Sequence, residues 1–98
     1  MNSETNLFVI DLEYRVSIEV VEPHLDAHIA FLEHCYATGV FLASGRKVPR
    51  TGGVILARGQ SKSEIETLVA GDPFHQHELA HYTITEFVPS MTAPSLQL

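Results

Sequence analysis

The chain has 98 residues, of which 45% are hydrophobic, and it carries a formal net charge of −6. This length predicts one small domain over residues 1–98, with a core from about residue 7 to residue 88 and a tail over 89–98. The negative charge argues against broad binding to nucleic acids, and no apolar stretch reaches the roughly 20 residues of a membrane span.

A strand is predicted at the start of this core. In residues 7–15 the apolar side chains at every second position, from Phe8 to Tyr14, give the two-residue period of a strand with one buried face. The alternation continues formally to residue 20, but a strand of about 14 residues would be unusual in so small a domain. We therefore predict a bend or short turn over 16–23, where Pro23 marks the entry of a helix.

A helix is predicted from His24 to about Thr38. Four apolar side chains recur at helical spacing and predict one stripe that faces the core: Leu25, Ile29, Leu32 and Tyr36. His28 falls on the margin of this stripe, and not on the solvated face. Gly39 is the expected stop.

A hairpin follows this helix. Residues 40–43 and 54–58 have the apolar composition of short strands. Between them, the Gly and Pro content of residues 44–53 predicts a long loop.

The last part of the chain is predicted to hold a helix, a short helical turn and a strand. The stretch Ser61–Glu64 matches a capping box, and Gly71 ends the helix that it starts. Residues 72–79 can form another short turn of helix, and 81–88 return to strand composition. The order strand, helix, strand, strand, helix, strand predicts a ferredoxin-like α+β fold, with one antiparallel sheet and both helices on one face.

His28 and Asp72 are the first candidates for chemistry. A histidine and a carboxylate that meet in the fold form a proton-handling pair, because the carboxylate fixes the imidazole tautomer and stabilises its charged form. Each residue also has a structural explanation: His28 as a boundary residue bonded to a backbone carbonyl, and Asp72, before a proline, as a helix N-cap. One carboxylate oxygen could cap while the other orients the imidazole, so these alternatives stay open.

Half of the six basic residues gather in the Gly-rich loop, as Arg46, Lys47 and Arg50. Fixed guanidinium groups and flexible backbone amides favour a carboxylate or phosphate ligand. A solvated loop tip, or a salt bridge across a dimer interface, is the alternative.

The six histidines suggest a metal site, with His24 and His28 one helical turn apart. However, no carboxylate or cysteine pair stands at a diagnostic spacing from them. Phosphate-binding loops, dinucleotide fingerprints and nucleophile motifs are also missing, so we expect no metal and no cofactor.

Several stretches together resemble the YciI-like family of small bacterial proteins, which carry the YCII-related domain. They are Ala27–Leu32, Gly39–Gly45, Val48–Arg58, Gly71–Phe74 and Tyr82–Phe87. The resemblance implies a ferredoxin-like fold of the dimeric α/β-barrel type, with subunits joined through their sheets.

For the site, the resemblance implies a catalytic dyad of His28 and Asp72, beside a loop that ends in Ser44 and Gly45. Arg46 departs from the family pattern, since many relatives have proline there. The family is also similar to muconolactone isomerase, and one member is associated with dehydrochlorination of a chloroaromatic breakdown product.

The leading hypothesis is a small lyase- or isomerase-like enzyme acting on an anionic organic molecule, such as an aromatic-degradation intermediate. His28 would shuttle a proton and Asp72 would hold its imidazole. The substrate would lie against Ser44, Gly45, Arg46, Lys47, Arg50 and Phe74. The alternatives are a non-catalytic ligand-binding or accessory module and a metal-binding protein.

As partners we expect a small anionic molecule and a second copy of the chain, with no nucleic acid and no membrane. The first six residues lack the basic and apolar regions of a signal peptide, and Cys35 has no second cysteine to pair with. Both features predict a cytoplasmic protein.

Overall fold

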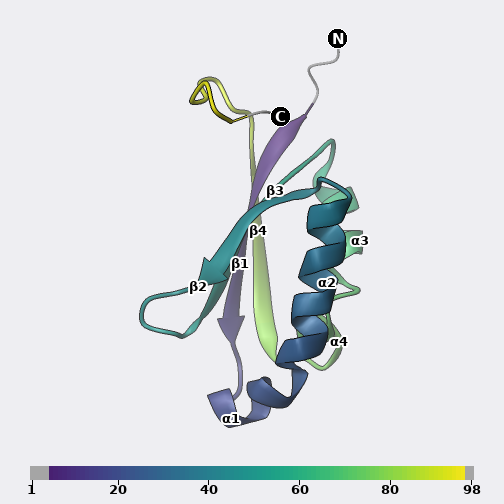
Figure 1. Cartoon of the computed structure of the whole chain (residues 1–98), viewed down its shortest axis with the longest axis vertical. Coiled ribbons are helices and arrows are strands. Elements are labelled where there is room, and N and C mark those ends of the chain that lie inside the picture. The colour runs from purple at the N-terminus through teal and green to yellow at the C-terminus, as the bar shows by residue number, and fades with distance from the viewer. Residues whose placement is uncertain (1–4, 97–98) are drawn as a thin grey trace.

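The computed structural model describes residues 5–96 and places four strands in one antiparallel sheet. In chain order they are β1 (Asn6–Tyr14), β2 (Phe41–Arg46), β3 (Gly52–Gly59) and β4 (Ala80–Phe87). The spatial order is β2-β3-β1-β4, with β1 and β3 in the middle. This order and the antiparallel pairing confirm the predicted ferredoxin-like α+β fold (Figure 1).

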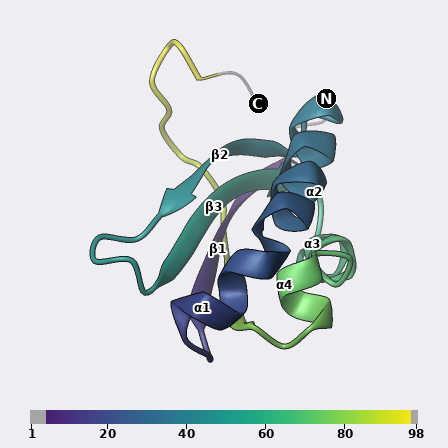
Figure 2. The same cartoon turned by 60° about the horizontal axis from the view of Figure 1, so that its bottom comes forward.

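The helices are α1 (Ile18–Val21), α2 (Leu25–Ala37), α3 (Lys62–Val69) and α4 (Pro73–Gln76), with a 3-10 turn η1 (Glu22–His24) before α2. The short helix α1 lies beyond the end of the sheet, and the other three cover one of its faces (Figure 1). Figures 1 and 2 show α2, α3 and α4 on the same side of the strands. The core lies between these two layers, because Phe8, Ile10 and Leu12 of β1 turn their side chains toward the helices and are buried.

The predicted turn over 16–23 is helical. Ser17 accepts hydrogen bonds through its backbone oxygen from the amides of Val20 and Val21, and this closes the single turn of α1. Pro23 lies in the first turn of η1, where its missing amide proton costs no helical hydrogen bond. The helix α2 ends at Ala37, and Gly39 follows its C-cap Thr38 with a φ of +85°, which favours glycine.

The buried face of α2 differs from the predicted stripe. His28 and Cys35 are its buried residues, whereas Ile29 and Tyr36 are each 40% exposed. The helix is therefore rotated, so that the predicted margin faces the sheet. The polar bond of His28 described below explains how an imidazole can occupy a core-facing position.

The predicted loop over 44–53 is wrong in its bounds, because both strands of the hairpin extend into it. Gly45 pairs with Val54 and Arg46 pairs with Gly53, which leaves a shorter connection. A Cβ atom at Gly52 would lie 1.8 Å from the carbonyl oxygen of Leu12, so glycine is needed there for close approach of β1. The glycines of this stretch are therefore explained by the close packing of strands, and not by a loop.

The remaining elements agree with the sequence pattern, with small shifts. Ser61 caps α3 by accepting from the amide of Glu64, whose side chain accepts from the amide of Gln60, one residue before the position of an ordinary capping box. Of the predicted tail, residues 97–98 lie outside the described residues, as do residues 1–4 of the predicted domain. None of the helices in residues 5–96 has the length and hydropathy of a membrane span, and the cytoplasmic location stays a prediction.

Candidate active site

A cavity of about 220 Å³ opens between α2 and the ends of the β2–β3 hairpin. The helix contributes apolar side chains and His28, and the hairpin contributes Ser44, Gly45, Arg46 and Arg50. Its walls are mostly apolar, with the basic residues on the hairpin side. Such a hollow, with a few polar groups in it, is the usual form of a small-molecule site.

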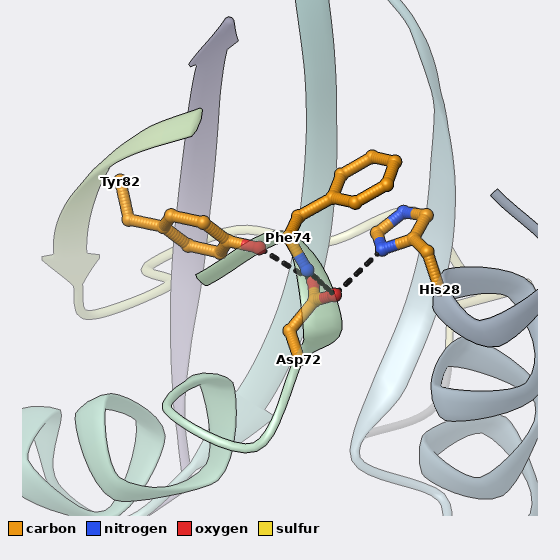
Figure 3. A network of polar contacts seen from close by, with 4 residues as sticks. All are labelled: His28, Asp72, Phe74 and Tyr82. Atoms are coloured by element: carbon orange, nitrogen blue, oxygen red, sulfur yellow. Dashed lines mark hydrogen bonds and ion pairs between the residues drawn. The ribbon is translucent and has the colours of Figure 1, made fainter. Parts of the chain in front are cut away.

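His28 and Asp72 meet at the wall of this cavity (Figure 3). The Nδ1 atom of His28 lies 2.8 Å from Oδ1 of Asp72, although the two residues are 44 positions apart in the chain. His28 is 9% exposed and lines the cavity, while Asp72 is fully buried behind it. The hydrogen bond between α2 and the start of α4 is therefore shielded from water, which strengthens it.

Asp72 has both of the roles that the sequence left open, but its oxygens divide them differently. Oδ1 accepts from the backbone amide of Phe74 at 3.0 Å, as an N-cap does, and the same atom bonds to His28. Oδ2 accepts from the hydroxyl of Tyr82 at 2.5 Å. The carboxylate thus has three donors, and each of them stabilises its charged form.

Phe74 holds the imidazole from its face. The rings of His28 and Phe74 are stacked with centroids 3.9 Å apart and planes at 2°. Phe74 was predicted to contact substrate, and it lies in the cavity wall. However, it is only 2% exposed, and the imidazole of His28 covers one face of its ring. Tyr14 also packs edge-on against Phe74, with ring centroids 6.1 Å apart. The stacked ring and the carboxylate together fix the position and orientation of His28.

This arrangement selects one tautomer of His28. A carboxylate oxygen only accepts, so Nδ1 carries a proton, and in the neutral imidazole the lone pair is therefore on Nε2. Figure 3 shows the second ring nitrogen on the edge away from Asp72. His28 can therefore accept a proton from a molecule in the cavity while Asp72 stabilises the resulting charge.

The hairpin residues fall into two groups. Arg46 and Arg50 line the cavity, and Ser44 does so with its hydroxyl 2.6 Å from that of Tyr36 on α2. Lys47 does not line it: its Nζ atom lies 2.8 Å from Oδ1 of Asp11, a β1 residue that points to the face without helices. Lys47, which the sequence placed with Arg46 and Arg50 as a substrate contact, thus lies outside the cavity lining and next to Asp11 instead.

The histidines do not gather around a common point. Within residues 5–96, no three His, Cys, Asp or Glu side chains are close enough to hold a metal ion. His24, which was considered as a metal partner of His28, instead packs its ring against His77, with centroids 4.4 Å apart.

Tyr82 is the member of this cluster that the sequence did not reveal as a site residue. It lies on β4 opposite Leu12 of β1, and this register turns its ring toward the helices. Burial, and then the negative charge of Asp72, raise the pKa of the Tyr82 hydroxyl, so it remains a proton donor. Strand alternation could have placed Tyr82 on the inner face, but no local signal pairs it with Asp72.

The YCII-related domain family matches residues 6–88 of the chain. Among solved structures, the chain is similar to 5-chloro-2-hydroxyhydroquinone dehydrochlorinase (TftG) from Burkholderia phenoliruptrix AC1100, in complex with 2,5-dihydroxybenzoquinone. That match has a TM-score of 0.73 and 24% identity, and covers 83% of this chain and 92% of that chain.

A second similar structure is SnoaB, a cofactor-independent oxygenase from Streptomyces nogalater. Its TM-score is 0.52 at 14% identity, and the match covers 94% of this chain and 99% of that chain. No curated protein sequence matches the chain significantly. At these identities, the two structures establish the fold alone.

Proposed function

We propose that this chain, which belongs to the YCII-related domain family, is a small lyase- or isomerase-like enzyme that moves a proton on an anionic organic substrate. The observation that carries this proposal is the 2.8 Å bond between Nδ1 of His28 and Oδ1 of Asp72 at the wall of an open cavity. A histidine that lines a cavity while its Nδ1 is bonded to a buried carboxylate has the arrangement of a general base.

In the proposed reaction, Nε2 of His28 removes a proton from a carbon next to a carbonyl or a leaving group. The electron pair of the broken C–H bond forms a double bond, and either the carbonyl oxygen takes the charge or the leaving group departs with its electrons. An isomerase would then return the proton to another carbon, and a lyase would release it. Asp72 stabilises the imidazolium throughout, and a positioned acid–base pair of this kind contributes roughly 10²–10⁴-fold in rate.

The basic side of the cavity supports an anionic substrate. Arg46 and Arg50 line the hollow in a chain whose formal net charge is −6, so they supply a local positive field. The similar fold of TftG, a dehydrochlorinase crystallised with a dihydroxybenzoquinone, supports a cyclic intermediate of aromatic degradation as the substrate class.

The proposal is tested first by a thermal-shift screen of muconate-like, lactone and chlorinated acids, since a ligand of the folded state raises the melting temperature. Each binder is then assayed for turnover with the wild type and with His28→Ala and Asp72→Asn. His34→Ala is the matched control, because His34 lies exposed on the same helix.

We expect His28→Ala to lose about 10²–10⁴-fold in turnover, while His34→Ala keeps it. Turnover that survives in His28→Ala would remove His28 from the reaction. Binding that survives in His28→Gln, with no turnover in the wild type, would favour the ligand-binding module instead.

The proposal includes a homodimer joined through the sheet. All the helices that pack on the sheet lie on one face (Figure 2), and at the centre of the other face Val9 and Leu56 are cross-strand neighbours with partly exposed apolar side chains. A second copy of the chain would cover them. Sedimentation equilibrium should give twice the chain mass, and Leu56→Lys should give the single mass, whereas Glu66→Lys on α3 should not change it.

A further inference from the structure

We infer that Tyr82 is a positioning residue of this site, and that its hydroxyl holds Oδ2 of Asp72 and thereby sets how strongly Oδ1 accepts from His28. The catalytic consequence rests on the proposed function, but the bond network can be tested without a substrate.

The Tyr82 hydroxyl completes the hydrogen bonding of a carboxylate that water does not reach. Asp72 is fully buried, and Oδ2 has its bond at 2.5 Å to Tyr82. Within residues 5–96, no buried side-chain nitrogen or oxygen lacks a hydrogen-bond partner. Removing the tyrosine hydroxyl would therefore leave Oδ2 of Asp72 buried without this donor, which is costly for a charged group.

The network also connects three separate elements. His28 comes from α2, Asp72 from the start of α4, and Tyr82 from β4 of the sheet. Because β4 pairs along its length with the central strand β1, the tyrosine provides a rigid anchor. The hydroxyl of Tyr82 holds Oδ2 of Asp72, while the amide of Phe74 holds Oδ1 beside His28, so Oδ1 keeps its place when the hydroxyl is removed (Figure 3).

Tyr82 also sets how strongly the carboxylate accepts from the imidazole. Hydrogen bonds donated to one carboxylate share its negative charge, so each donor weakens the acceptor for the others. The hydroxyl stays protonated, because burial and the adjacent Asp72 raise its pKa. Loss of the hydroxyl should therefore strengthen the bond from Nδ1–H of His28, and a more acidic hydroxyl should weaken it.

The test is the proton resonance of His28 Nδ1–H in ¹⁵N-labelled protein, assigned by its loss in His28→Gln. Tyr82→Phe should move this resonance downfield. Tyr36→Phe, which also removes a hydroxyl in a short bond, but at Ser44, should leave it in place. An unmoved or upfield resonance in a folded Tyr82→Phe protein would overturn the inference.

A second variant keeps the test decisive if Tyr82→Phe does not fold. Incorporation of 3-fluorotyrosine at position 82 retains the hydroxyl and makes it a stronger donor, so the His28 resonance should move upfield. A downfield or absent shift would contradict the inference. The two variants thus have opposite expected signs, which a merely structural role for the ring does not produce.

Kinetics then test the catalytic consequence. With a substrate from the screen, Tyr82→Phe should lower kcat by about tenfold or more and leave KM unchanged, because a bond to a charged group is lost away from the substrate. An unchanged kcat with a shifted resonance would remove the catalytic role of Tyr82. A wild type without any turnover would remove the proposed function, while the resonance still decides whether Tyr82 positions Asp72.

Discussion

The cluster around Asp72 and the basic hairpin border the same cavity, but they are built in opposite ways. Asp72 is fully buried, and its two oxygens accept from three donors on three different elements. In the hairpin, Arg46 is exposed, Arg50 is half-buried, and Lys47 is turned to the far face by its bond to Asp11. A site that needs one fixed geometry is buried and fully bonded, whereas a site that receives a ligand keeps its charges near water.

The largest expected effect is on stability, at Asp72. Asp72→Ala removes the acceptor of three buried donors and the cap of α4, and we expect a loss of about 3–5 kcal/mol in the free energy of unfolding. Glu86→Ala is the matched control, because the bond that its carboxylate accepts from Asn6 has the same 2.8 Å length but is exposed, on the helix side of the sheet. That control should cost about 0–1 kcal/mol.

Urea denaturation of the wild type and both variants measures the difference. Equal losses for Asp72→Ala and Glu86→Ala would contradict the contrast between a buried and an exposed bond.

The second prediction concerns the hairpin and separates binding from chemistry. Arg50→Ala should raise KM by about 10–100-fold with little change in kcat, because a charged hydrogen bond to substrate, of about 1.5–3 kcal/mol, is made before and during the reaction. Lys47→Ala removes the same charge from the far face, and it should leave KM unchanged. Steady-state kinetics of both variants provide the test, and a fall in kcat with unchanged KM for Arg50→Ala would move that residue into the catalytic step.

The difference between the two regions also explains what the sequence could predict. The strand and helix periods predicted the fold, and the Asp-Pro step predicted the cap at Asp72, because both are local signals. The same local signals failed at Gly45 and Gly52, whose strand pairing depends on close approach of distant backbone.

The candidate site was only partly predictable for the same reason. The resemblance to a family singled out His28 and Asp72, but the rotation of α2 that buries His28 follows from a bond to a residue 44 positions away. For Tyr82, strand alternation alone indicated an inward-facing side chain. Its contact with Asp72 could not be predicted, because it depends on the register of β4 against β1. Contacts between elements set these details, and a single sequence does not record them.

The third prediction is a loss of stability at alkaline pH. Burial first, and Asp72 next, raise the pKa of Tyr82 above its ordinary value of 10.0, and the same two causes raise that of Cys35 above 9.0. Between the unfolded and the folded pKa the folded chain holds more protons, so stability is fully present below the unfolded values and falls as pH rises through them.

Urea midpoints measured across the alkaline range test this dependence. Tyr82→Phe should flatten the fall above pH 10.0, and the tyrosinate absorbance that Tyr82 contributes should appear only as the chain unfolds. If Tyr82 ionised in the folded chain near the ordinary tyrosine pKa of 10.0, this would contradict its buried contact with Asp72.

The smallest effect is expected at Tyr36, whose bond to Ser44 is nearly as short as that of Tyr82 to Asp72. The distance is 2.6 Å, but the pair is exposed and neutral. Tyr36→Phe should change the free energy of unfolding by less than about 0.5 kcal/mol, because water replaces the lost partner. Tyr82→Phe should cost about 1–3 kcal/mol, because Oδ2 of Asp72 is left buried. Equal costs in urea denaturation would mean that water reaches Asp72, and the buried cluster would then be no more rigid than the hairpin beside it.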